Sequence, residues 1–164
     1  LLKGGTGSKS DSEFQPDFLP DKYESGTLNA IGIYSLSSSL DYIMKNKDEI
    51  FEKERDLIRL FIDNIKGNKY ITIYGPLSVE NRTSVISFNI NNLPCSDVSR
   101  ILDFEYGIMS RPGLHCSPLA HKTIGTFPTG TVRFSFNSFN SSNQIYYAID
   151  AIEDIIEKYV KKYE

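Results

Sequence analysis

The side chains with the most reactive chemistry lie in one short segment of the chain. His115 precedes Cys116 directly, and His121 follows five residues later. A cysteine reacts as its thiolate, and neighbouring arginine or histidine cations lower the pKa of a thiol. Because glycine and proline residues surround this segment, we expect Cys116 to lie on an exposed loop. The sequence therefore predicts a nucleophilic thiol at Cys116.

Other interpretations of the same segment remain open. An isolated cysteine is more often a small buried side chain, and both histidines would then be surface residues. His115, Cys116 and His121 lack a fourth ligand and the paired spacing of zinc sites, so we predict no metal. In a cysteine–histidine hydrolase His115 would be a poor base, because adjacent side chains diverge, and His121 would have to fold back. Cys95 stands between a proline and a helix start and receives no role.

Two arginines, Arg111 and Arg133, stand at the two ends of this segment. A guanidinium binds a carboxylate or a phosphate through two parallel hydrogen bonds, although surface ion pairs are equally common. Apolar and polar residues alternate over 131–136, so Arg133 is expected to point away from the core. The pair indicates recognition of an anionic group.

A second cluster combines glycines with hydroxyl side chains near the start of the chain. Gly5 and Thr6 belong to one glycine-rich run, and Thr27 precedes the first predicted helix. Backbone N–H groups and hydroxyls at a helix start bind anions such as phosphate. Ordinary turns and caps use the same residue types, and no P-loop lysine follows.

The elements that must position these clusters follow from hydrophobic periodicity. Helices are predicted over residues 29–47, 48–65 and 96–106, and after a capping box formed by Ser141 and Gln144. The first two are expected to be antiparallel or sharply bent neighbours, with Thr27 or Asn29 as the first cap. Strands are predicted over 70–74, 84–90, 108–110 and 131–136, with a loop over 111–130 and an ordered arm over 1–25. This irregular order predicts an α+β fold with a small antiparallel or mixed sheet covered by helices.

Composition excludes several classes of protein. The 164 residues are 40% apolar and 24% charged, which suits one globular domain rather than a disordered chain. Eighteen Lys and Arg against 21 Asp and Glu give a net charge of −3 without a basic stripe, so we expect no nucleic-acid partner. No apolar run reaches the roughly 20 residues of a membrane helix and no secretion signal is visible, so we expect a cytoplasmic protein without membrane contact.

Five segments taken together resemble the cysteine desulfurase-like group of class V aminotransferases. They are GGTGS, ESGTLNAIGI, RPGLHCSPLAH, GTVRFSFNSFN and the final helix, in the order and spacing of that group. The resemblance covers essentially the whole chain but only the carboxyl-terminal part of the family. It implies that residues 1–28 are a cofactor-loop arm from the end of a large domain and that residues 29–164 are the small domain. With Leu1 as its first residue, the chain is interpreted as a fragment.

The resemblance also implies a cofactor and an assembly. Members of the group are homodimeric fold-type-I enzymes that use pyridoxal 5′-phosphate (PLP), and their Schiff-base lysine lies in the large domain, outside this chain. Thr27 matches the threonine that reaches the PLP phosphate of the partner subunit, and Gly5 and Thr6 lie in the loop beside it.

The implied reaction takes sulfur from L-cysteine and releases L-alanine. Cys116 matches the cysteine that accepts the sulfur as a persulfide, which a sulfur-acceptor protein could then receive. Arg133 matches the arginine that holds the substrate carboxylate, and Arg111 and His115 match supporting positions near the site. Leu114 stands where long-loop members often have another histidine, which argues against the housekeeping sulfur-mobilising subgroup. Ordinary amino-group transfer, a selenocysteine or C–S lyase and a noncatalytic interaction fragment remain as alternatives.

Overall fold

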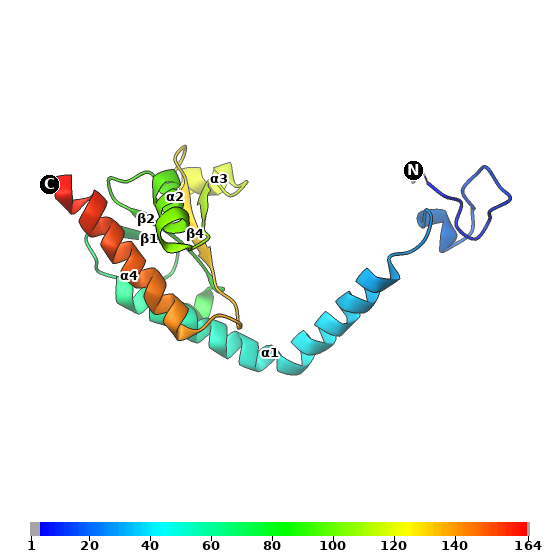
Figure 1. Ribbon diagram of the computed structural model, residues 1–164, viewed down its shortest axis with the longest axis horizontal. Coiled ribbons are helices and arrows are strands. Elements are labelled where there is room, and N and C mark those ends of the chain that lie inside the picture. The colour runs from blue at the N-terminus through cyan, green and yellow to red at the C-terminus, as the bar shows by residue number, and fades with distance from the viewer. Residues whose placement is uncertain (1–3, 164) are drawn as a thin grey trace. The chain divides into compact units, whose positions relative to one another are not determined.

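The computed structural model describes residues 4–163, which divide into two compact units (Figure 1). One unit ends at Asn46 and the other begins at Lys47. The helices and strands are α1 (Ala30–Ile65), β1 (Ile71–Tyr74), β2 (Val85–Ile90), α2 (Cys95–Tyr106), β3 (Arg111–Gly113), α3 (Pro118–Thr123), β4 (Thr131–Ser135) and α4 (Ser142–Tyr159). None of the helices within 4–163 is long and apolar enough to cross a membrane. The predicted boundary between residues 28 and 29 stays a prediction.

The first unit contains the glycine-rich arm and the beginning of α1. A short 3-10 turn, Asp21–Tyr23, is the regular element of the arm, whose first three residues lie outside the described range. Asn29 caps α1, because its Oδ1 accepts the N–H of Gly32 at 2.9 Å. Of the two predicted caps, the structure therefore uses Asn29 and not Thr27.

α1 is one helix, and the prediction of two helices meeting at residues 47–48 was wrong. Asp48 has the type of a capping residue, but no glycine or proline interrupts the chain near it. The helical hydrogen bonds can therefore continue through this position. Side-chain burial in α1 is confined to its last turns, from Leu57 to Ile65.

The second unit is built on a four-stranded sheet with the order β1-β2-β4-β3, antiparallel throughout. The α+β prediction is confirmed, but the edge strand lies at Arg111–Gly113 and not at the predicted 108–110. Gly107 ends α2 in the left-handed conformation, and the N–H of Ile108 returns to the carbonyl of Leu102 at 2.8 Å. Residue 108 therefore completes the helix cap. Pro112 is tolerated in β3 because an edge strand can lack one N–H donor.

One face of the sheet is apolar and carries the core. Phe88 of β2 and Phe134 of β4 are buried on this face, with the ring of Phe61 of α1 at 5.9 and 5.6 Å from theirs. α2 packs against α4 and against β2, β3 and β4 (Figure 1). The opposite face carries polar residues of the same strands, among them Asn89 and Arg133. Arg133 therefore points away from the core, as its alternation predicts.

The other helix starts show what local signals can and cannot determine. Ser141 caps α4 and forms the predicted capping box with Gln144. α2 begins at Cys95, one residue before the predicted start, because Pro94 takes the cap position without a side-chain hydrogen bond and the expected capping at Ser96 or Asp97 does not occur. The predicted loop 111–130 is also more regular than expected, because β3 and α3 lie within it.

Candidate functional site

The predicted site residues fall into the two units. The second unit holds Cys116, His115, Arg111 and Arg133, and the first holds the glycine and threonine cluster. Each group is described within its own unit.

Cys116 lies in a tight turn between β3 and α3. The carbonyl of Leu114 accepts the N–H of Ser117 at 2.8 Å, and the two central residues, His115 and Cys116, have φ of 50° and 59°. Positive φ at both central positions is the pattern of a type I′ turn, which glycine and asparagine normally occupy. Each ordinary side chain there costs about 1–3 kcal/mol, so surrounding contacts must hold the turn. The thiol of Cys116 is exposed, as predicted.

His115 is half-buried, and its ring is anchored on β4. Its Nε2 lies 3.2 Å from the hydroxyl of Thr131 on β4, and its buried Nδ1 has no hydrogen-bond partner among the described residues. Burial lowers the pKa of His115, and the charges of Arg133, His121 and Arg111 lower this pKa further. His115 is therefore a neutral imidazole near pH 7.

His121 folds back into the protein. It is only 4% exposed, its Nδ1 lies 2.6 Å from the hydroxyl of Thr126, and its ring centroid is 5.6 Å from that of His115. The interpretation of the histidines as surface residues is therefore wrong for His121, whereas His115 is half-buried. Sequence reasoning missed Thr126 and Thr131 as partners, because nothing in their spacing marks them as histidine partners.

Arg111 and Arg133 stand directly opposite each other on β3 and β4. The same cross-strand row continues to Ser87 and Tyr74, so it lies on the polar face of the sheet. Nε of Arg133 is buried without a partner, and none of the ion pairs between described residues involves either arginine. Two adjacent guanidiniums without a carboxylate are suited to binding an anion.

Close backbone contacts fix the two ends of the segment that carries Cys116. A Cβ added at Gly130 would lie 2.3 Å from the carbonyl carbon of Gly113, and Gly130 has φ of +83°. The side chain of Asn89 donates to the carbonyl of Gly130 at 3.1 Å and accepts the N–H of Val132 at 3.3 Å. Asn89 therefore positions the start of β4, a role that its place on a predicted polar face did not reveal.

The glycine and threonine cluster lines a cavity of about 580 Å³ in the first unit. Gly5, Thr6 and Thr27 all contribute to its wall, so the structure brings these three predicted residues together. The hydroxyl of Thr27 forms no hydrogen bond with another described residue, which suits contact with a phosphate oxygen. Asp21 and Glu24 also line the cavity, and their negative charge opposes the binding of a phosphate by this unit alone.

The remaining candidate ligands do not form a metal site. Within residues 4–163, no three histidine, cysteine or acidic side chains come close enough to hold a metal ion. Cys95 is buried, and its Sγ lies 3.1 Å from the carbonyl oxygen of Thr129. We assign Cys95 to packing.

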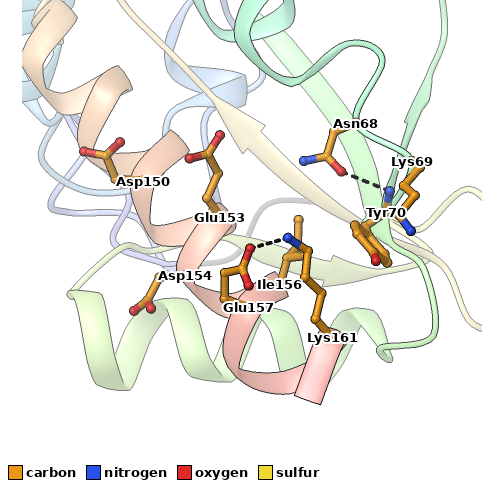
Figure 2. Close-up of a pocket in the computed structure, with 9 residues that line it drawn as sticks. All are labelled: Asn68, Lys69, Tyr70, Asp150, Glu153, Asp154, Ile156, Glu157 and Lys161. Carbon is orange, nitrogen blue, oxygen red and sulfur yellow. Dashed lines mark hydrogen bonds and ion pairs between the residues drawn. The ribbon is translucent and has the colours of Figure 1, made fainter. Parts of the chain in front are cut away.

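A further pocket of about 500 Å³ lies between α4 and the connection from α1 to β1 (Figure 2). Glu157 pairs with Lys161 at its edge, and Asn68 accepts the N–H of Tyr70 at 3.0 Å. None of the predicted site residues lines it. The close-up contains no reactive thiol or histidine, and we assign the pocket no chemistry.

The chain is similar in sequence to proteins of a known family. Residues 2–147 match the family Aminotransferase class-V. A probable cysteine desulfurase of Methanothermobacter thermautotrophicus is 35% identical over 161 residues, which are 94% of this chain and 39% of that protein.

Two similar solved structures are also those of cysteine desulfurases. The apo cysteine desulfurase of Thermococcus onnurineus matches with a TM-score of 0.75 and 30% identity, over 84% of this chain and 34% of its own. The cysteine desulfurase CsdA of Escherichia coli, in an S-sulfonic acid form, matches with a TM-score of 0.72 and 26% identity, over 84% and 33%. The chain therefore spans two fifths or less of the length of these relatives.

Proposed function

The chain belongs to the class-V aminotransferase family, and from this premise we propose that it is the carboxyl-terminal part of a PLP-dependent cysteine desulfurase. The observation that carries the proposal is the thiol of Cys116, which is exposed in a strained turn. Its neighbour in this turn is His115, whose pKa is lowered by burial and by the charges of Arg133 and Arg111. A reactive thiol and a carboxylate-binding pair are the two groups that sulfur removal from an amino acid requires of this part of the enzyme.

In the proposed reaction the C–S bond of L-cysteine breaks and an S–S bond to Cys116 forms. The substrate sulfur leaves as the outer sulfur of a persulfide, and the β-carbon gains a proton, so that L-alanine results and no external oxidant is needed. PLP supplies the electron sink for this chemistry when it is bound. The protein must place the thiol beside the substrate sulfur and hold the substrate in one orientation.

The residues of the second unit divide this work. Arg133, whose Nε lacks a partner among the described residues, is proposed to bind the substrate carboxylate, with Arg111 adding positive charge from the adjacent strand. His115, whose pKa is lowered and whose ring is fixed on Thr131, shapes the site without adding a positive charge of its own.

The first unit is proposed to contact the cofactor. The unpaired hydroxyl of Thr27 and the small glycine neighbours fit a phosphate group, and the resemblance assigns that phosphate to the PLP of the partner subunit in a homodimer. Because Asp21 and Glu24 make the cavity acidic, the positive charge that retains the phosphate must come from elsewhere in the enzyme. We propose a cytoplasmic homodimer that passes its sulfur to an acceptor protein.

The reaction class is tested by the products that the full-length enzyme forms from L-cysteine. We expect sulfide, in the presence of a thiol reductant, and L-alanine in equal amounts without any keto acid. Cys116→Ser should abolish both products and leave the absorption of bound PLP unchanged, whereas Cys95→Ser should have little effect. Turnover that requires a keto acid and persists in Cys116→Ser would instead indicate amino-group transfer. Unchanged sulfide release in Cys116→Ser would contradict the role of this thiol.

A further inference from the structure

The turn that carries Cys116 needs an external support. Both of its central residues have ordinary side chains in a left-handed conformation, and the side chain of Cys116 is exposed. Such a conformation persists only where surrounding contacts determine it. The central residue with such contacts is His115.

His115 contacts two groups through its ring. Its Nε2 lies 3.2 Å from the hydroxyl of Thr131, and its ring lies against that of His121 with centroids 5.6 Å apart. The first contact ties the turn to β4. The second ties it to α3, which begins two residues after Cys116.

His121 is built as a rigid support. It is buried, its Nδ1 is 2.6 Å from the hydroxyl of Thr126, and its own carbonyl accepts the N–H groups of Thr126 and Phe127 at 2.8 and 3.2 Å. A buried imidazole retains its place when a polar partner satisfies it, and Thr126 supplies that partner. The proposed reaction assigns no chemical step to His121.

We propose that His121 is a positioning residue: its ring holds His115, and this contact places the thiol of Cys116 close enough to Arg111 and Arg133 for their positive charge to act on it. The inference rests on the proposed function in so far as Cys116 is the reacting thiol. It adds a residue that touches neither substrate nor cofactor and acts through His115.

The test compares two alkylating reagents on the chain itself, without PLP. Iodoacetate carries a carboxylate and iodoacetamide is neutral, but both react with the same thiolate. The ratio of their rate constants therefore cancels the exposure and ionisation of the thiol and reports the local positive charge. Cys95→Ser in every variant leaves Cys116 as the one thiol, low salt preserves the field, and the urea-unfolded chain gives the reference ratio.

We expect the folded chain to favour iodoacetate several-fold more than the unfolded chain does. His121→Ala should lower this ratio at least threefold, towards the unfolded value, and His115→Ala should do the same, with no further loss in the double variant. His121→Phe keeps a ring against His115 and should retain more than half of the preference. His121→Asn keeps a polar group for Thr126 but has no ring, and should lose most of the preference for iodoacetate.

The matched control compares the same substitution at two threonines. Thr126→Val removes only the hydroxyl that holds His121 and should lower the ratio, whereas Thr72→Val removes a hydroxyl bonded to Asn91 on the far edge strand and should not. If His121→Ala does not fold, as judged by circular dichroism, His121→Phe and Thr126→Val decide.

An unchanged ratio in folded His121→Ala and Thr126→Val, an equal loss in Thr72→Val, or a folded chain whose ratio equals the unfolded value would each overturn the proposal. Because no turnover is measured, failure of the proposed reaction would appear separately, as persistent sulfide release in the Cys116→Ser enzyme.

Discussion

At the scale of single residues, the arrangement of Arg111 and Arg133 is unfavourable unless an anion binds there. Like charges directly opposite each other on adjacent strands repel, and no ion pair between described residues offsets this repulsion. A carboxylate bound beside the two guanidiniums would offset their repulsion, because both of them attract it. The side chain to change first is Arg133, because its Nε is buried without a partner.

Arg133→Ala in the PLP-loaded enzyme should remove the carboxylate contact of the substrate. Loss of a two-bond contact costs about 2–4 kcal/mol in the transition state, so kcat/KM for L-cysteine should fall by roughly 30- to 1,000-fold. Arg133→Lys keeps the charge but not the planar fork and should recover only part of the activity. Normal steady-state kinetics in both variants would show that Arg133 does not bind substrate.

His115 predicts a pH dependence of folding stability. Its pKa lies below the ordinary value of 6.5, chiefly because of burial, so the folded protein binds the proton less readily than the unfolded chain. The stability that comes from the neutral ring is fully present above pH 6.5 and is lost as the pH falls towards the folded-state pKa.

Urea unfolding of the chain between pH 7.5 and 5 should therefore show a smaller pH dependence in His115→Gln than in the unmodified chain. Because glutamine cannot gain the proton, this substitution removes the contribution of His115 to the pH dependence of stability. An identical pH dependence in both proteins would mean that His115 titrates normally.

At the scale of elements, the sequence patterns predicted those strands and helix caps whose position depends on local residue order. Strands β1, β2 and β4 and the capping box of Ser141 lie where their patterns place them. The position of β3 could not be predicted, because it depends on its register with Arg133 and Thr131 some twenty residues later. The type I′ turn of Cys116 was missed for the same reason: distant contacts hold it against its local preference.

Gly130 provides a test of how tightly the Cys116 segment is closed. Gly130→Ala should lower the free energy of unfolding by about 3 kcal/mol or more, because a left-handed conformation and a contact with Gly113 oppose the new methyl group. Gly125→Ala is the matched control, since Gly125 has φ of +75° but open space around it. Its cost should be only about 1–2 kcal/mol. Equal effects of the two variants on chemical denaturation would contradict the close approach of Gly113 and Gly130.

At the scale of the whole molecule, the two units differ in how far they can bury their apolar surface. The second unit has a core of its own, whereas α1 in the first unit exposes Ile31, Tyr34 and Met44 by 70% or more of their surface. Met44 belongs to the periodic stripe that predicted the helix, and within the described chain this stripe does not form a core. Exposed apolar patches of this kind are typical of protein interfaces, which supports the proposal of a larger enzyme.

The chain alone should fold but bind no stoichiometric PLP. Its acidic cavity opposes retention of the phosphate, and the resemblance places the Schiff-base lysine outside this sequence. Adding PLP, reducing with borohydride and mapping the peptides should give no single modified lysine and no release of L-alanine from L-cysteine. One specifically modified lysine together with alanine release would require a complete site within these 164 residues.

The central claim is that Cys116 accepts the substrate sulfur, and the most direct measurement is the mass of the peptide that carries it. The full-length enzyme is incubated with L-cysteine, freed of small thiols, alkylated without reduction and digested. We expect one additional sulfur atom on the Cys116 peptide, in an amount that approaches one per active site, and none on the Cys95 peptide. A Cys116 peptide without added sulfur, in enzyme that still releases L-alanine, would contradict it.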